Sequence, residues 1–371
     1  MSTTGRTAAT DADDSALAAT LREAEVVHLV SHADGDALAA AGLLATALPD
    51  DTPYQMSTVR TRAAADRRLA SSAATTVALG FETEAADGHV DGSAVSYVAY
   101  DVARDLDSAD PVLALAGGIA AGVPAHGDAL DDAEATGLER RPGVGIPTAD
   151  LGDGLAHSTW YHASVSGDEQ QAGALLAELA LPAEMDDEAH QRVASALAMD
   201  ATEPPASASA ASALERALRP HVLPNGPVET LEGFADVLES LARSAPGLGA
   251  ALAVGHPDRT EALSVWREHA IAAHEAVRRG DRTRTSGLVG LETDDADAWT
   301  VARLVRDFRS AEPAVLVVGT NEVALATTET NAVDRLQSVD AIDSVGGRET
   351  LASGPTDASV ADIRSSLEVS P

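Results

Sequence analysis

The stretch VVHLVSHADGDALAAAGLLATAL, residues 26–48, decides how the rest of the chain is interpreted. Its mainly apolar run 26–30 predicts a short buried strand, and its Ala/Leu-rich second half predicts a helix packed behind that strand. Between them, His32, Asp34 and Asp36 occupy alternate positions of a loop, so their side chains project to one side. Imidazole and carboxylate groups at this spacing suit a divalent cation. The simpler interpretation, in which Asp36 caps the helix and His32 ends the strand, stays open.

This loop resembles the first motif of the DHH phosphoesterase superfamily, in which His-x-Asp-x-Asp-Gly precedes a small-residue helix; Ala37 stands where the family has Gly. Within the superfamily it is most similar to the RecJ-like proteins of archaea. The resemblance implies that His32, Asp34 and Asp36 are metal ligands. In the family, two Mn²⁺ ions activate a water and stabilise the leaving oxygen of a phosphodiester.

Composition indicates a halophilic source. The 371 residues carry a formal net charge of -34, and all 25 basic residues are arginine, because the chain has no lysine. Such a charge repels itself in dilute buffer, whereas in molar salt the Debye length is about 3 Å and the repulsion fades. The acidity therefore reports the habitat, and it does not exclude nucleic acid as a partner.

Several classes of protein are excluded by what the sequence lacks. There is no cysteine, which rules out disulfides, thiol nucleophiles and Cys-ligated metals. There is neither an apolar N-terminal leader nor an apolar run near the ~20 residues of a membrane span. We expect a cytoplasmic protein that does not contact a membrane.

Two further aspartates match the family in order and spacing. The segment 94–102 predicts a strand with Asp101 near its carboxyl end, at the same sheet edge as the first loop. In the resemblance Asp101 is the second-motif aspartate that bridges the metals. Asp200, at the end of a predicted helix 189–199, matches the fourth motif. Without the resemblance, each would be an ordinary turn or helix terminus.

The third motif is broken. The run VLALA, residues 112–116, predicts a buried strand, and family members continue from it into the Asp-His-His triplet. Here the aligned residues are Ala116, Gly117 and Gly118, none of which can ligate a metal. The resemblance then implies at most one Mn²⁺ (or Mg²⁺) ion, with Asp101 as the residual catalytic residue if any activity survives.

Two basic features predict contacts to nucleic acid. Near the C-terminus, Gly346, Gly347 and Arg348 resemble the Gly-Gly-His loop of the DHH-associated domain, with Arg348 at the histidine position. Paired glycines permit close approach to a phosphate and arginine can add a bidentate contact, although a plain turn is the alternative. The most basic window of the chain, RRGDRTRT, supplies four arginines: Arg278, Arg279, Arg282 and Arg284.

We therefore expect an α/β protein of two domains, each with a mainly parallel sheet flanked by helices, facing across a cleft and joined by a helical segment. The predicted division is an acidic N-terminal tail (1–20), a DHH-type phosphoesterase domain (21–205), a helical connector (206–284) and a DHH-associated nucleic-acid-binding domain (285–371).

The resemblance implies a RecJ-like protein of a halophilic archaeon that binds single-stranded DNA or RNA in DNA replication or repair as a catalytically impaired pseudoenzyme. Its partner would be an active RecJ-like paralogue or a replication complex, as for the RecJ-derived accessory subunit of the eukaryotic replicative helicase. Two alternatives stay open: an active Mn²⁺-dependent 5′–3′ exonuclease on single strands, and a phosphodiesterase on short oligonucleotides or cyclic dinucleotides.

Overall fold

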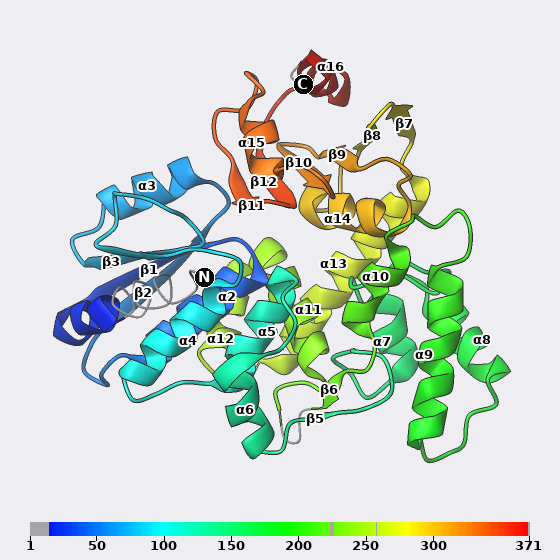
Figure 1. The fold of residues 1–371 in the computed structure, drawn as a ribbon, viewed down its shortest axis with the longest axis horizontal. Helices are drawn as coiled ribbons and strands as arrows, with labels where there is room; N and C mark the ends of the chain where they lie inside the picture. Colours follow the sequence, from blue (N-terminus) through cyan, green and yellow to red (C-terminus); the bar gives the residue numbers. More distant parts are fainter. Residues whose placement is uncertain (1–14, 223–225, 257, 370–371) are drawn as a thin grey trace, which may run out of the picture.

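The computed structural model describes residues 15–222, 226–256 and 258–369 (Figure 1). Most of the predicted acidic tail, residues 1–14, lies outside this range. The last residues of that tail belong to a helix over 15–23, which buries Leu17 and Leu21 in the main core.

The N-terminal sheet has four parallel strands in the order β2-β1-β3-β4. Their bounds are β1 Val27–His32, β2 Tyr54–Val59, β3 Thr75–Leu79 and β4 Gly88–Val90. The strand predicted at 26–30 is confirmed as β1, and the helix predicted at 37–48 is confirmed as α2 (Gly35–Ala47). Because the strands are parallel, all four carboxyl ends lie along the edge that receives the SHADGD loop.

Two segments predicted as strands are helices: 94–102 lies in α4 (Val95–Asp105), and VLALA lies in α5 (Pro111–Ala121). Both predictions were wrong because a short apolar run does not distinguish a buried strand from a buried helix. Asp110 caps α5 and Pro111 opens it.

Small residues let α5 pack closely on its neighbours. A Cβ at Gly117 would come 2.6 Å from Ser96 Cβ on α4 and 2.8 Å from Ala39 Cβ on α2. The positions aligned with the lost triplet, Ala116, Gly117 and Gly118, are thus interior positions of a helix bundle, where an imidazole does not fit.

Helices fill the middle of the chain. Apolar spacing along the sequence predicts helices at 170–181, 189–199, 231–243 and 259–279, and all four are present (Figure 1). The bounds of the helices and short strands in this part are α6 Gly127–Ala135, β5 Glu139–Arg140, α7 Leu151–His157, α8 Glu169–Glu178, α9 Asp187–Ala201, α10 Ala210–Leu214, β6 His221–Val222, α11 Leu231–Ser244, α12 Pro246–Ala253 and α13 Arg259–Arg279. Helix α11 is buried along nearly its whole length among these helices.

The C-terminal sheet has six strands in the order β11-β12-β10-β9-β8-β7, and only β8 and β9 pair in parallel. The expectation of a mainly parallel sheet is therefore wrong here, because short connections join β7 to β8, β9 to β10 and β11 to β12 as antiparallel pairs. The bounds are β7 Arg282–Thr285, β8 Leu288–Glu292, α14 Ala298–Phe308, β9 Ala314–Val318, β10 Glu322–Thr327, α15 Ala332–Gln337, β11 Gly346–Arg348, β12 Leu351–Pro355 and α16 Val360–Val369.

One core connects the two sheets. Helix α14 covers one face of the C-terminal sheet, and its buried residues belong to the same cluster as those of β1 and α2. A second cluster lies on the other face, beneath α15 and α16. The main core therefore continues from the first sheet through α11 to the second (Figure 1).

Candidate functional site

The predicted ligands at the end of β1 and the start of α2 are buried, and among the described residues their three potential ligand atoms do not all lie within 4.8 Å of one another. His32, Asp34 and Asp36 expose 1%, 9% and 4% of their surfaces. His32 Nδ1 and Asp34 Oδ2 are 2.7 Å apart and hydrogen-bonded. His32 Nε2 is buried and has no hydrogen-bond partner within the described residues. We call these three residues the acidic edge.

Each carboxylate of the acidic edge already has its partners. Asp34 Oδ1 accepts from the Ala37 backbone N–H at 2.8 Å and caps α2. Asp36 accepts from the backbone N–H groups of Val95 (2.6 Å) and Ser96 (2.9 Å), at the start of α4. Asp36 thus ties the first loop to the helix that was expected to be a strand.

The two carboxyl groups differ in protonation. Burial alone would raise the pKa of Asp34, but the charge and hydrogen bond of His32 and the charge of Arg348 hold it well below its usual range. Burial and the negative charge of Asp34 raise the pKa of Asp36 to about 7. Near neutral pH Asp34 is therefore ionised, whereas Asp36 is close to the midpoint of its titration.

Residues 344–348, which end in the short strand β11 and which we call loop 344–348, lie over His32 of the acidic edge. A Cβ on Gly346 would overlap the Arg60 carbonyl oxygen and come 3.0 Å from His32 Nε2. Gly347 has φ +136°, which favours glycine. The glycine pair predicted to approach a phosphate instead approaches the protein's own backbone. Arg348 lies 5.5 Å from the Trp299 ring centre.

A buried arginine links helix α11 to residues on either side of α14 and β9. Arg243 of α11 is fully buried and pairs with Asp297 at 2.9 Å and Glu322 at 2.6 Å. Burial would lower the pKa of Arg243, but the two carboxylates raise it further above its usual value. Arg60, which follows β2, also pairs with Glu322 and donates to the Arg243 carbonyl at 2.9 Å. We call Arg243, Asp297 and Glu322 the arginine clamp.

The buried carboxylate of Glu239, on α11, also links the first loop to α14. Glu239 accepts from the Gly35 backbone N–H at 2.7 Å and from Trp299 Nε1 at 2.8 Å. The Trp299 ring in turn lies 5.5 Å from the ring of His32. The loop after β1, helix α11 and helix α14 are thus held in one hydrogen-bonded layer.

Sequence reasoning missed this layer, although a signal was present. Four charged residues of α11 are spaced 4, 3 and 4 apart, which places them on one helix face: Glu232, Asp236, Glu239 and Arg243. All four are buried. A charged stripe in an otherwise apolar helix predicts buried ion pairs, since such charges are rarely buried without partners.

The other two predicted metal ligands are placed elsewhere. Asp101 is exposed on α4. Asp200 lies on α9, where its Oδ2 accepts from Ser164 N at 2.9 Å and Ser164 Oγ at 2.7 Å. Among the described residues, neither joins His32 and Asp34 in a group of three potential ligand atoms within 4.8 Å.

These residues do not fit a two-metal centre. The oxygens of Asp34 and Asp36 are used by backbone and imidazole groups, the loop is buried, and Asp101 and Asp200 stand apart from it. A metal bound there would have to displace helix caps, which stabilise a protein by about 1 kcal/mol each.

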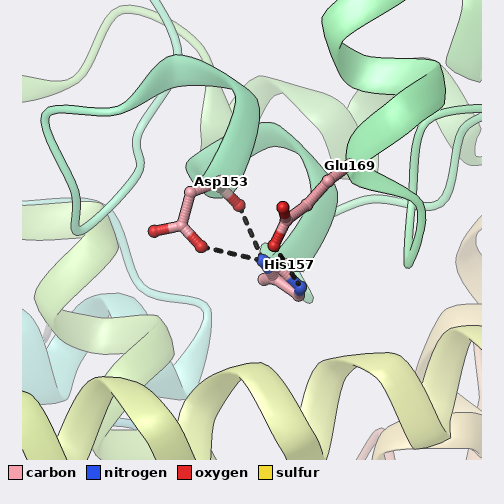
Figure 2. Close-up of side chains that lie close together, drawn as sticks. All are labelled: Asp153, His157 and Glu169. Carbon is pink, nitrogen blue, oxygen red and sulfur yellow. Dashed lines mark hydrogen bonds and ion pairs between the residues drawn. The ribbon is translucent and has the colours of Figure 1, made fainter.

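Three potential ligand atoms do lie within 4.8 Å of one another at Asp153, His157 and Glu169, on α7 and α8 (Figure 2). His157 Nδ1 lies 2.9 Å from the Asp153 carbonyl oxygen and 3.0 Å from Asp153 Oδ1. Arg267 binds both carboxylate oxygens of Asp153, at 2.7 and 2.8 Å. Arg267 thus neutralises the Asp153 carboxylate that a cation would need, and we interpret the group as an ion-pair network.

The four arginines of the basic window have different partners in the structure. Arg279 pairs with Glu275, and Arg284 pairs with Glu312 at 2.5 Å. Arg278 and Arg282 each donate to a backbone carbonyl oxygen, of Ser166 and Val277 respectively. The four arginines predicted as one surface therefore differ in whether their charge is already paired.

A hollow of about 640 Å³ opens beside the arginine clamp, between the loop after β2 and the C-terminal sheet. Charges of both signs line it, including Arg60, Arg67, Asp294 and Asp295. The acidic edge does not line this hollow. No described helix is both long and apolar enough to cross a membrane.

Comparison with solved structures supports the fold. The chain is similar to CDC45 from Entamoeba histolytica, with a TM-score of 0.60 and 10% identity over 96% of this chain and 98% of that one. A lower TM-score of 0.47, with 14% identity, relates it to RecJ from Thermus thermophilus in complex with Mn²⁺, over 97% of this chain and 54% of that one. The chain thus shares its fold with CDC45 over nearly the whole length of both chains.

The sequence comparisons give the family. Residues 280–367 match the model described as the C-terminal domain of uncharacterized protein rrnAC1427. The uncharacterized protein rrnAC1427 of Haloarcula marismortui is 45% identical over 354 residues, which cover 94% of this chain and 92% of that protein. This chain therefore belongs to the haloarchaeal rrnAC1427 family.

Proposed function

We propose that this protein binds single-stranded DNA or RNA in replication or repair without hydrolysing it, as a pseudoenzyme of the RecJ-like type. The observation that carries the proposal is the buried acidic edge, in which Asp34 and Asp36 cap helices and loop 344–348 lies over His32. A hydrolase of this type would need those carboxylates open to metal ions and substrate.

The comparison with CDC45 supports the same direction, since the similarity extends over nearly all of both chains. The sequence resemblance points to an active RecJ-like paralogue or a replication complex as the protein partner. Under this proposal the division into 21–205, 206–284 and 285–371 separates a former catalytic part from a connector and a nucleic-acid-binding part. We expect at most one weakly bound Mn²⁺ or Mg²⁺ ion per chain.

The test uses protein purified in about 2–3 M KCl, because a chain of this charge needs screening to stay compact. Labelled single strands, duplexes and cyclic dinucleotides are incubated with Mn²⁺, and single-strand binding is measured in parallel. We expect binding of single strands and no cleavage of any substrate.

One outcome would overturn the proposal in favour of the exonuclease alternative. In that outcome the purified protein degrades single strands when Mn²⁺ is present. The Asp34→Asn variant loses this activity, although its circular dichroism spectrum is unchanged. Cleavage restricted to cyclic dinucleotides would favour the small-substrate phosphodiesterase instead. Both outcomes require the acidic edge to open in solution.

A further inference from the structure

Two arginines of the basic window have no carboxylate partner among the described residues. The sequence has 59 acidic residues against 25 arginines. In the described part of the chain Arg279 and Arg284 pair with carboxylates, whereas Arg278 and Arg282 have no carboxylate oxygen within 4.0 Å. Each unpaired guanidinium keeps free N–H donors.

A third guanidinium joins these two. Arg309 directly follows α14, which packs along α13, and its Nη1 donates to the Phe308 carbonyl oxygen at 2.9 Å. It too lacks a carboxylate within 4.0 Å among the described residues. Burial and the charge of Arg282 lower the pKa of Arg309. We call Arg278, Arg282 and Arg309 the arginine cluster.

A pair of buried histidines lies near Arg278, because Arg278 and His274 both border Gly167. His162 Nδ1 lies 3.0 Å from His274 Nδ1, and His274 Nε2 lies 3.0 Å from the Ser158 carbonyl oxygen. Burial, His274 and then all three arginines of the cluster lower the pKa of His162 far below its usual value. The imidazoles are therefore neutral and add no charge that could offset the guanidiniums.

The nearest acid does not neutralise the cluster. The charge of Asp200 raises the pKa of Arg309, but Asp200 lies beyond 4.0 Å and is held by Ser164. Arg278 is fixed against the turn at Gly167, where a Cβ would come 3.1 Å from its Nη2. Arg278, Arg282 and Arg309 thus have no carboxylate partner among the described residues, and a bound anion would reduce the repulsion between their charges.

We propose that the arginine cluster binds phosphate groups of single-stranded nucleic acid, an inference that rests on the proposed function for the identity of the polymer. Guanidinium groups match phosphate oxygens with two parallel hydrogen bonds, and their low hydration favours such contacts at partly buried positions. The phosphate site then lies at the junction of α13, β7 and α14, on residues apart from the acidic edge.

The chain supplies a matched control for the test. The double variant Arg282→Gln/Arg309→Gln removes two cluster charges, and Arg279→Gln/Arg284→Gln removes two paired charges from the same window. Both change the net charge equally. Affinity for a fluorescein-labelled oligothymidylate of about 20 nucleotides is measured by anisotropy over a KCl series.

We expect the cluster variant to bind about 10- to 100-fold more weakly and the control less than about 3-fold more weakly, because hydrogen bonds to charged phosphates are removed only in the first. The slope of log K against log [KCl] should become shallower by about 0.7 for each phosphate that is no longer bound. Equal losses of affinity in both variants, or no loss in either, would overturn the inference. If neither variant loses affinity, Arg348→Ala tests whether loop 344–348 contacts the oligonucleotide instead.

A second probe separates this inference from the proposed function. If the wild-type protein binds no oligonucleotide, the proposed function fails, and calorimetry with inorganic tripolyphosphate then tests the site alone. Tripolyphosphate binding that is abolished in the cluster variant would sustain a phosphate site. Binding of neither probe, or binding of a poly-glutamate peptide in preference to both, would refute it.

Discussion

The acidic edge and the arginine cluster are two concentrations of charge that the fold treats in opposite ways. In the acidic edge every carboxylate oxygen of Asp34 and Asp36 accepts a hydrogen bond from the chain itself. In the arginine cluster the guanidiniums bind backbone carbonyls and keep their charge unpaired. Charge that is satisfied internally stabilises the fold, whereas charge left unpaired is available to a ligand.

The largest effect is expected at the arginine clamp. Arg243→Met should lower the free energy of unfolding by about 3–5 kcal/mol, because Asp297 and Glu322 would be left buried without a counter-charge. Urea unfolding at fixed KCl measures it. The control Arg104→Met breaks an exposed pair with Asp128 and should change stability by no more than about 1 kcal/mol. Similar losses of stability in the two variants would contradict the structural role of the clamp.

A pH-dependent effect follows from Asp36. Its folded pKa of about 7 lies above the ordinary aspartate value of 3.8, so the folded state binds more protons between these values. The contribution of Asp36 to stability is therefore present at low pH and lost as pH rises towards 7. The stability difference between wild type and Asp36→Asn should fall by about 2–3 kcal/mol between pH 5 and pH 8.

The comparison with Asp36→Asn isolates this carboxyl from the histidines. Buried His274 has a lowered pKa of about 3 and favours stability as pH rises, but it titrates equally in both proteins. Asp34 stays ionised across the window because its pKa is lowered. A difference that does not vary with pH would show that Asp36 is hydrated in solution and that the edge is open.

A smaller effect tests the cover. Gly346→Ala should lower the free energy of unfolding by about 1–3 kcal/mol, because the new Cβ overlaps the Arg60 carbonyl oxygen. Gly173→Ala is the control, since a Cβ in that part of α8 meets nothing within 4 Å and should be neutral or stabilising. If Gly346→Ala is as stable as wild type, loop 344–348 does not lie on the edge in solution.

The smallest effect is expected at the arginine cluster. Arg282→Gln should change the free energy of unfolding by no more than about 0.5 kcal/mol, with stabilisation the favoured direction, because it removes repulsion and no ion pair. Thermal unfolding at two KCl concentrations measures it. A destabilisation above about 2 kcal/mol would mean that the side chain is structural and would weaken the contrast with the acidic edge.

The sequence predicted best where periodicity and a local motif agreed. The strand at β1, the helix α2 and the long helix 259–279 follow from apolar spacing and end signals that are local to each segment. The contact between His32 and Asp34 agrees with the predicted alternation, whereas Asp36 lies in the first turn of α2 and binds the start of α4. The protonation of the two aspartates did not follow from the sequence, because it depends on Val95, Ser96 and Arg348, which lie far along the chain.

The failures have a physical cause as well. The Ala/Gly-rich run in α5 was interpreted as a strand because small apolar residues carry no period, and only its packing against α2 and α4 makes it helical. Arg278, Arg279, Arg282 and Arg284 look equivalent in sequence. They differ only through Glu275 and Glu312, and the second of these is 28 positions from Arg284. The Arg279–Glu275 pair is four positions apart and lies within a window of neighbouring residues, whereas the Arg284–Glu312 pair is invisible to such a window.

The cover over the acidic edge also sets an order of events during folding. Arg60 and Glu322 are separated by 262 positions, and the Ala63–Ser344 hydrogen bond that docks the covering loop spans 281. Contacts of such long range form slowly, because a large loop must close before they stabilise anything. On a ribosome the four strands of the first sheet emerge long before the segment that covers them. A nascent chain therefore carries its aspartates in water for most of its synthesis, and burial of that loop is among the last steps of maturation.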